Sequence, residues 1–356
     1  MSKTTTNIRI IIQYLLITTS LFLFSACKKE NEKLTSKQYF IFGTIIEVLV
    51  WHNDDKLVNK ALIEVEAELN GMHSQWHAWK PGRLNQINSA LRSGKSFNIT
   101  NEEKEFIQAT INLSELSKGY FNPTIGQLIN MWGFHTDTYP ILEPPPKVSE
   151  IESFLRIKPS MQDLKFNGMF ISSKNKSIWL DYGGVAKGYA IDKAIKILKS
   201  FGIDNAIVNA GGDLRSIGTK GNKNWRVAIR KPNSEDILTS INVDGDESIF
   251  TSGNYERYKE FDGKRHAHII DPFTGYGVEE IVSATVIAEN GTKADAAATA
   301  LIVAGIENWH LVAESMKLDQ VLLINADSEC FATKAFMERI DDNELTCNVD
   351  ISDVKK

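Results

Sequence analysis

The chain has 356 residues, which is long enough for one large domain or two closely packed ones with a buried core. Hydrophobic residues make up 42% of it and charged residues 24%, a composition that excludes a disordered or fibrous protein. The net charge is -5 and the lysines and arginines are scattered, so we expect no nucleic-acid partner.

The first 26 residues are typical of a secretory signal. Two basic residues precede a largely apolar run over residues 10–24, which is too short to cross a bilayer comfortably. Two small residues then lead to Cys27, as in the lipobox of bacterial lipoproteins, whose cysteine is acylated after cleavage. We therefore expect a signal peptide over 1–26, a lipid anchor on Cys27 and a polar tether over 27–38. The alternatives are an uncleaved anchor helix and an ordinary signal with an incidental cysteine.

Strand and helix signals begin after this tether. The segment 39–51 is rich in β-branched and aromatic residues and predicts a first strand, interrupted by a glycine. Asp54 or Asp55 can cap the long amphipathic helix that follows. Further along, Thr100 and Glu103 have the spacing of a capping box, which predicts the start of a second helix.

The second half of the chain carries mostly strand signals. The predicted elements are a strand at 178–181, a helix that ends at 198, strands at 205–209, 225–229, 248–251 and 282–288, a helix at 293–303 and a hairpin at 321–333. Strands outnumber helices and do not alternate with them regularly, which favours an α+β fold over a doubly wound sheet. A proline cluster at 140–146 marks a loop inside one domain, which we place at 39–345, with a C-terminal tail at 346–356.

A carboxylate, a glycine turn and a lysine follow one another closely after the predicted strand at 178–181. The run DYGGVAKG places Asp181 at the strand end and Lys187 in the first turn of a helix. Glycines allow a ligand to approach the backbone, and the free N–H groups of a helix N-terminus attract phosphate oxygens. The glycine spacing fits neither a Walker A motif nor a Rossmann fingerprint. Taken alone, the segment is better explained as a tight strand-to-helix turn capped by Asp181.

Asp295 and Thr299 are four residues apart in an alanine-rich segment, so a helix would stack them on one face. A carboxylate and a hydroxyl at a helix start offer hard oxygen ligands to Mg²⁺, which prefers few protein ligands plus waters and substrate phosphates. The simpler alternative, which these residues alone favour, is an N-cap at Asp295 and a satisfied interior hydroxyl at Thr299.

His266 and His268 lie two residues apart on a strand-like stretch, which directs both side chains to one side. A histidine near pH 7 can accept a proton from an attacking hydroxyl. No third nitrogen or sulfur ligand lies nearby at a useful spacing, which argues against a zinc site. Surface histidines on an edge strand explain this segment, taken alone, equally well.

Cys330 and Cys347 are the cysteines that remain besides Cys27. Neither belongs to a CxxC or a Cys/His metal spacing, so we expect no structural zinc and no thiol catalysis. In an exported protein the two could pair as a disulfide, but the flanking sequence leaves the pairing open.

Several segments, taken together and in order, resemble the ApbE family. They are YFNPTIG from Tyr120 with WGF from Trp132, DYGGVAKGYAID from Asp181, NAGGD from Asn209, TSGNYERY from Thr251, HIIDPFTG from His268 and ADAAATAL from Ala294. The resemblance covers residues 39–333. Six ordered motifs are far more specific than any one of them, and they override the simpler explanations given above.

The resemblance implies an exported enzyme that transfers FMN from FAD to another protein. ApbE proteins use Mg²⁺ to cleave the FAD pyrophosphate, release AMP and join FMN through a phosphoester to a threonine or serine of a flavoprotein. The implied acceptor is a subunit of an NADH:quinone reductase or an Rnf-type complex. The implied fold is α+β, with two related β-α-β halves and the active site between them. We expect the protein on the periplasmic side of the bacterial cell envelope, held by the lipid on Cys27.

The family's site residues carry over position by position. The flavin-nucleotide contacts match Phe42, Trp76, Tyr120, Phe121, Asn122, Asp181, Lys187 and Ile269. The Mg²⁺ ligands match Asp295, Thr299 and the carbonyl of Gly184. His268 is the expected general base, with Asp271 or His266 as second choices. Two positions depart from the pattern, since Asn122 stands where aspartate is common and Phe42 replaces a frequent methionine. The segment 76–83 also holds extra residues.

The same residues would serve two other functions. An FAD pyrophosphatase would use water in place of a protein hydroxyl and would give free FMN and AMP. A non-catalytic lipoprotein would only bind, store or deliver FAD. A scaffold that keeps the fold alone is disfavoured, because the candidate metal, base and nucleotide residues occur together.

Overall fold

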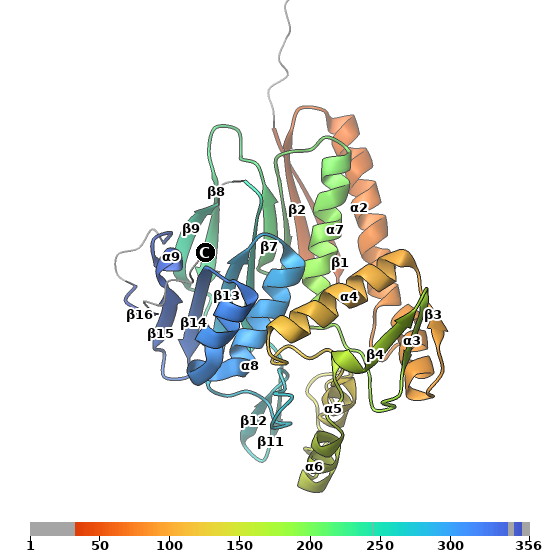
Figure 1. Cartoon of the computed structure of the whole chain (residues 1–356). Helices are drawn as coiled ribbons and strands as arrows, with labels where there is room; N and C mark the ends of the chain where they lie inside the picture. Colours follow the sequence, from red (N-terminus) through yellow and green to blue (C-terminus); the bar gives the residue numbers. More distant parts are fainter. Residues whose placement is uncertain (1–32, 244, 341–344, 351–356) are drawn as a thin grey trace, which may run out of the picture. The chain divides into compact units, whose positions relative to one another are not determined.

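A nine-stranded sheet built from both halves of the chain organises the structure, a computed structural model (Figure 1). In spatial order its strands are β1 (Lys33–Ile41), β2 (Thr44–His52), β6 (Ala206–Ala210), β7 (Asp213–Ile217), β10 (Glu247–Gly253), β13 (Ile281–Ala288), β14 (Gln320–Asn325), β15 (Cys330–Thr333) and β16 (Asn348–Asp350). The structure describes residues 33–243, 245–340 and 345–350, so the expected signal peptide and Cys27 lie outside the described residues.

Each half of the sheet consists of a β-hairpin, a helical connection and a second β-hairpin. In the first half α2 (Asp55–Gln75) and α7 (Ala186–Ser200) connect β1–β2 to β6–β7. In the second half α8 (Gly291–Met316) connects β10 and β13 to β14 and β15. The α+β class is therefore confirmed. The strands that flank the helical connections pair antiparallel, β2 with β6 and β13 with β14. Each expected β-α-β half is therefore the central part of a longer hairpin–helix–hairpin unit.

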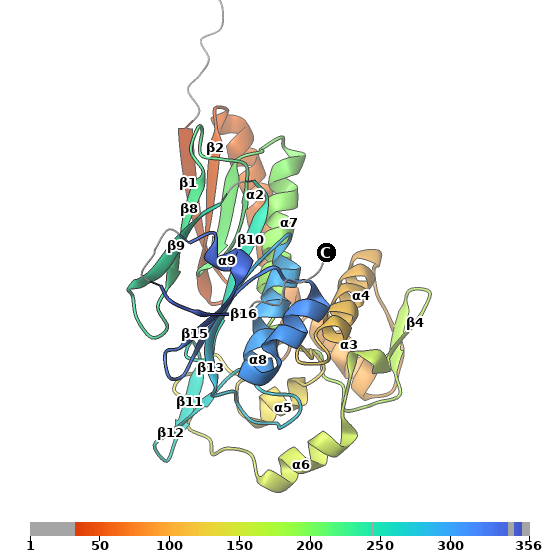
Figure 2. The same cartoon turned by 60° about the vertical axis from the view of Figure 1, so that its left-hand side comes forward.

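Both faces of the sheet are covered. In β2 the side chains of Ile46, Val48 and Val50 are fully buried at alternate positions, as the strand period of two requires. They belong to the larger core, which is shared with α2, α7 and α8, and Figure 2 shows these helices on one side of the sheet. The opposite face carries a second core, covered by β8 (Trp225–Arg230), β9 (Ile237–Val243) and α9 (Lys334–Met337). Burying one such aliphatic side chain stabilises the fold by about 1.5–3 kcal/mol.

A long segment is inserted between α2 and α7. Its elements are α3 (Arg83–Arg92), β3 (Phe97–Asn98), α4 (Asn101–Leu116), α5 (Gly126–Met131), α6 (Val148–Ile157), the 3-10 turn η1 (Met161–Asp163), β4 (Leu164–Asn167) and β5 (Phe170–Ser173). Thr100 Oγ1 accepts from the N–H of Glu103, and the Glu103 carboxylate accepts from the N–H of Thr100, so the predicted capping box of α4 is confirmed. A shorter insertion between β10 and β13 forms the hairpin β11 (Tyr258–Phe261) and β12 (Lys264–Ala267).

Three predicted boundaries need correction. The tether predicted for 27–38 is too long, because β1 begins at Lys33 and a two-residue turn joins it to β2. The tail predicted for 346–356 contains β16, which pairs parallel with β15. The strand predicted for 178–181 is reduced to one isolated bridge between Ile125 and Trp179. The domain therefore extends beyond the predicted 39–345 at both ends.

The helix predicted for 293–303 continues as α8 to Met316, but it is interrupted close to the predicted end. Gly305 has a φ of 68°, and Glu280 Oε2 accepts from the N–H of Ile306, which restarts the helix. By length and composition α8 could cross a membrane. However, 67% of its most apolar window is buried inside the protein, which is the pattern of a core helix.

Cys330 and Cys347 form a disulfide, a pairing that the sequence left open. The bond closes a loop with a sequence separation of 17 and fixes the start of β16 beside β15. The last strand is therefore held both by backbone hydrogen bonds and by a covalent link.

Candidate active site

The helices α7 and α8 cross at two glycines. A Cβ on Gly188 would overlap the carbonyl oxygen of Gly291, so the two backbones approach as closely as only glycine permits. Gly188 N–H donates to Asp295 Oδ2 at 2.9 Å. Asp192, one turn further along α7, accepts from the N–H groups of Gly291 and Thr292 at the start of α8. The crossing therefore brings the first turn of α7 against the first turns of α8.

The three residues predicted to hold Mg²⁺ lie at this crossing. A Cβ on Gly184 would come within 2.9 Å of Thr299 Oγ1, so the glycine turn lies directly against that hydroxyl. Ser252 Oγ lies 3.4 Å from the same hydroxyl oxygen. Asp295 Oδ2 is engaged by Gly188, while Oδ1 accepts no hydrogen bond from the described residues. A free carboxylate oxygen, a hydroxyl and a backbone carbonyl suit Mg²⁺, which prefers oxygen ligands.

Asp295 is almost completely buried, and its environment favours the protonated form when no cation is present. Burial raises the pKa of Asp295 to about 7, Lys187 opposes this shift, and the neighbouring Asp213 adds to it. A divalent cation at this carboxylate would compensate the burial and the repulsion from Asp213. No group of three or more His, Cys, Asp or Glu side chains that could hold a metal occurs among the described residues, so the fit rests on this mixed oxygen set.

Lys187 forms an ion pair with Asp213 at the start of α7. Burial alone would lower the pKa of the Lys187 ammonium, but the charges of Asp213 and Asp295 outweigh it and raise the pKa. Asp213 is held in turn by the N–H of Thr251, which donates to its Oδ1 at 2.9 Å. The N–H groups of Ala186, Gly188 and Tyr189 already donate within the protein. The fixed positive charge of Lys187 is therefore the feature of this turn that suits phosphate oxygens.

Asp181 makes two hydrogen bonds. Its Oδ1 accepts from the N–H of Gly183 at 2.8 Å, so the predicted turn geometry is present, and its Oδ2 lies 2.8 Å from His135 Nε2. Burial alone would raise the pKa of Asp181, but the hydrogen bonds from His135 and from the Gly183 N–H outweigh it and lower the pKa. The carboxylate is thus ionised and fixed at both oxygens. Beside it, the ring of Trp79 stacks on His135 with centroids 4.9 Å apart.

His268 has the tautomer that a general base requires. Its Nδ1 lies 2.9 Å from the carbonyl oxygen of Arg257, so Nδ1–H donates there and Nε2 is left as the acceptor. Burial lowers the pKa of His268 to about 4, and the positive charges of Arg257 and Lys187 act in the same direction. His268 contacts Phe134 and His266 contacts Trp132, so both histidines lie against the segment 132–134.

Asp271 organises the loop that follows. Its carboxylate accepts from the N–H of Phe273 at 2.7 Å and from the hydroxyl of Thr274 at 2.9 Å. Both oxygens therefore serve the turn, which makes Asp271 a weaker candidate for the base than His268. Ile269, the other predicted residue of this motif, is buried and accepts from the N–H of Val278 through its carbonyl.

The residues predicted to contact the flavin lie in different parts of the structure. Phe42 lies in the turn between β1 and β2 with a φ of 57°. Tyr120 meets Phe273 of the Asp271 loop with ring centroids 5.1 Å apart, whereas Phe121 is buried in the larger core. The Asn122 side chain accepts from the N–H and the hydroxyl of Thr124 in its own loop, and it donates to the more distant carbonyl of Pro159. Of these four residues, Tyr120 contacts the segment that begins at His268, through Phe273.

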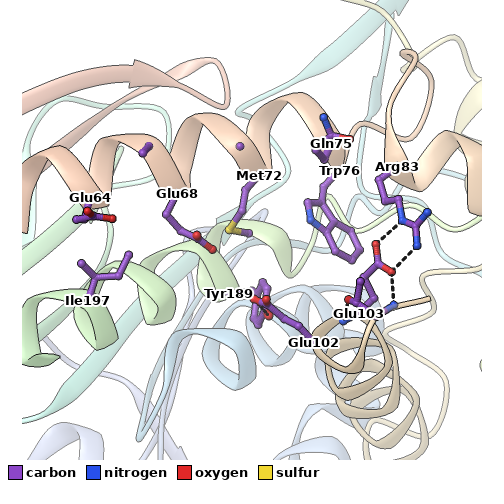
Figure 3. Close-up of a pocket in the computed structure, with 13 residues that line it drawn as sticks. Glu64, Glu68, Met72, Gln75, Trp76, Arg83, Glu102, Glu103, Tyr189 and Ile197 are labelled. Carbon is purple, nitrogen blue, oxygen red and sulfur yellow. Dashed lines mark hydrogen bonds and ion pairs between the residues drawn. The ribbon is translucent and has the colours of Figure 1, made fainter. Parts of the chain in front are cut away.

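Trp76 lines a pocket of about 660 Å³ between α2, α4 and α7 (Figure 3). The pocket is bordered by several glutamates and by the pair of Arg83 and Glu103, and none of the candidate metal residues lines it. The Trp76 ring packs against Phe106 at 5.1 Å. Trp79, three residues later, is the tryptophan that stacks on His135 beside Asp181.

The fold defines an α+β protein of two hairpin–helix–hairpin halves, and its candidate site lies where α7 of one half crosses α8 of the other. The model of the ApbE family matches residues 42–322, and the chain therefore belongs to the ApbE family. A Rhodobacter capsulatus FAD:protein FMN transferase is 38% identical over 306 residues, which are 86% of this chain and 58% of that relative. A Vibrio cholerae FAD:protein FMN transferase is 29% identical and is covered over 94% of its length.

Solved structures agree with this assignment. The ApbE protein from Thermotoga maritima superposes with a TM-score of 0.79 at 28% identity, covering 87% of this chain and all of that one. The flavin transferase ApbE from Vibrio cholerae gives a TM-score of 0.74 at 28% identity, covering 86% and 99% of the two chains. The whole site crossing lies within the matched region.

Several residues of the site were missed from sequence. Asp213 and Ser252 lie inside the NAGGD and TSGNYERY motifs, so their motifs were recognised but not their roles. Trp79 and His135 belong to no recognised motif. Their role follows only from the folded structure, in which His135 contacts Asp181 and Trp79 stacks on His135.

Proposed function

We propose that this protein transfers FMN from FAD to a hydroxyl group of another protein and releases AMP. The observation that carries the proposal is the crossing of α7 and α8, which gathers Gly184, Lys187, Asp295 and Thr299 in a chain of the ApbE family. The names of the relatives, FAD:protein FMN transferase, supply the reaction.

The candidate oxygens of Gly184, Asp295 and Thr299 would hold Mg²⁺, which when bound neutralises charge on the pyrophosphate. Lys187 at the start of α7 would bind phosphate oxygens and stabilise the charge that develops as the bond breaks. Asp181 is ionised and fixed, so it can accept a hydrogen bond from a donor on the nucleotide.

His268 acts on the acceptor. Its Nε2 takes the proton of the threonine or serine hydroxyl as that oxygen bonds to the phosphorus on the FMN side. The bond from this phosphorus to the bridging oxygen breaks, and the bridging oxygen leaves with AMP. Water in place of the hydroxyl would give the pyrophosphatase reaction, and a protein that only stores FAD would break no bond.

The test is incubation with FAD, Mg²⁺ and a candidate acceptor, followed by intact mass of the acceptor and an AMP assay. We propose as acceptor a flavoprotein subunit of an NADH:quinone reductase or an Rnf-type complex. Transfer predicts an acceptor heavier by one FMN residue. FMN and AMP that appear free, with an unmodified acceptor, would identify a pyrophosphatase.

We also propose that the protein is anchored by a lipid on Cys27 at the periplasmic side of the bacterial cell envelope. The lipobox-like segment before Cys27 supports this, and so does the Cys330–Cys347 disulfide, since such bonds persist in oxidising compartments. Protein purified from membranes should begin at an acylated Cys27. A different N-terminus, or a Cys27 without acyl chains, would refute the anchor.

A further inference from the structure

His135 is enclosed by two tryptophans and a carboxylate. Only 2% of its side chain is exposed. Trp79 stacks on the imidazole with an interplanar angle of 16°, and the tilted ring of Trp179 lies 4.9 Å away, measured between centroids. Its Nε2 lies 2.8 Å from Asp181 Oδ2. The ring is therefore fixed by stacking and aligned by one hydrogen bond to Asp181.

The hydrogen bond defines the roles of the two nitrogens. Asp181 is ionised and can only accept, so the proton lies on Nε2 of His135. Nδ1 is buried and has no hydrogen-bond partner among the described residues. A buried polar atom without a partner costs about 1–3 kcal/mol, and a phenyl ring would fill the same space without that cost. An imidazole here is therefore explained by what Nε2–H does for Asp181.

Asp181 transmits this contact to the glycine turn. Its other oxygen accepts from the N–H of Gly183, and the next residue, Gly184, lies against Thr299. Fixing both carboxylate oxygens fixes the plane of the carboxylate relative to the start of α7. Removing His135 would free one oxygen of a nearly buried carboxylate and leave it without a hydrogen-bond donor from the protein.

We propose that His135 is a positioning residue that holds the Asp181 carboxylate in the orientation in which it binds the flavin nucleotide. This inference rests on the proposed function, in which Asp181 contacts FAD. His135 itself follows the WGF motif and belongs to none of the recognised segments. Its effect should therefore be on FAD affinity, exerted through Asp181, with little effect on the chemical step.

Two substitutions separate the hydrogen bond from the packing. His135→Phe keeps an aromatic ring between the tryptophans but removes the donor, whereas His135→Gln can place its amide N–H where Nε2–H lies. A hydrogen bond to a charged group is worth about 1.5–3 kcal/mol, so His135→Phe should weaken FAD binding by about 10- to 100-fold. KM for FAD should rise by a similar factor while kcat changes by less than about threefold. His135→Gln should recover most of the affinity.

FAD affinity is measured by flavin fluorescence titration with Mg²⁺ present, and melting temperature is measured in parallel. His310→Phe is the matched control, because His310 lies exposed on α8 beside Trp309. If His135→Phe fails to fold, His135→Asn replaces it, since its shorter amide reaches the Nδ1 position but not Asp181. In the Asp181→Asn background, His135→Phe should add less than about a twofold further loss of affinity.

Normal FAD affinity in His135→Phe would overturn the inference. So would an equal loss in the Phe and Gln variants with a lower melting temperature, because that pattern belongs to a packing role. Failure of the proposed function would look different, since the wild-type protein would then not bind FAD or not transfer FMN.

Discussion

At the residue scale, the chemistry depends on which atoms are free. Nδ1–H of His268 is committed to the carbonyl of Arg257, so Nε2 is the nitrogen that can accept a proton. Oδ2 of Asp295 is committed to Gly188, so Oδ1 is the oxygen that can bind a cation. Asp271, by contrast, uses both oxygens within its own loop. These existing hydrogen bonds distinguish His268 from Asp271 as the candidate base, which the sequence motif alone could not do.

The His268→Ala substitution should slow transfer by about 10²- to 10⁴-fold while FAD and Mg²⁺ affinities stay near normal, because a general base acts on the chemical step. The pKa of about 4 keeps His268 neutral at neutral pH, so with Mg²⁺ held saturating the wild-type rate should fall only as pH drops through about 4. Rates of transfer are measured against pH at saturating FAD and Mg²⁺. Wild-type turnover by the variant would contradict the assignment of His268 as the base. A wild-type limb near pH 6.5 that disappears in the variant would contradict the lowered pKa but would keep His268 as the base.

Asp295 should make Mg²⁺ binding depend on pH. Its pKa is raised to about 7, so the carboxyl holds a proton below that pH and must release it to bind the cation. Mg²⁺ affinity should fall by up to about tenfold per pH unit below pH 7 and become level above it. Calorimetric titrations across pH 5.5–8.5 measure this.

Asp295→Ala should abolish both this dependence and turnover, with only a modest loss of FAD affinity. The matched control is Asp319→Ala, which removes an exposed carboxylate just before β14. Full activity in Asp295→Ala with unchanged metal content would remove Asp295 from the metal site.

At the element scale, the α7–α8 crossing carries the site. Gly188→Ala should destabilise the protein by about 1–3 kcal/mol, because its Cβ overlaps the Gly291 carbonyl and forces the helices apart. Transfer should also fall, since Asp295 moves away from the start of α7. Gly71→Ala is the control on α2, where a Cβ meets nothing within 4 Å and should stabilise by about 0.5–1 kcal/mol. Equal stability of the two variants in urea would contradict the close crossing.

The last strand should depend on its disulfide for stability, not for activity. Cys347→Ser opens a loop with a sequence separation of 17 and should lower the free energy of unfolding by about 3 kcal/mol. Transfer should remain normal, since β15 and β16 lie at the sheet edge and carry none of the candidate site residues. Urea unfolding and the transfer assay check both parts. Alkylation of Cys347 in the native, unreduced protein would show that the bond is absent.

Sequence reasoning succeeded where a signal is local. The Thr100–Glu103 capping box needs four residues, and the DYGGVAKG turn needs eight, so both could be predicted. It failed where partners are distant. Residues 33–38 look like a tether because the strand β2 that pairs with them comes only after the turn at Phe42. Residues 178–181 look like a strand, but only Trp179 finds a bridging partner.

The candidate site also contains residues that local spacing predicts and residues whose contacts are distant in the sequence. Asp295 and Thr299 share a helix face, a relation that their spacing already contains. His135 and Asp181 are 46 residues apart, and Trp79 is further still, so their contact exists only after the inserted segment folds back onto the start of α7. Motifs predicted the metal and base residues for this reason, whereas the aromatic support of Asp181 required the structure.

At the scale of the whole molecule, the two hairpin–helix–hairpin halves meet at the α7–α8 crossing, and the proposed transfer of FMN would take place there. The most direct measurement is the ratio of AMP released to acceptor modified, with FAD and Mg²⁺ and with the acceptor present or absent. Transfer predicts one AMP for each FMN attached, with little AMP when the acceptor is absent. AMP release at the same rate without acceptor, or FAD binding with no AMP at all, would contradict the proposed transfer.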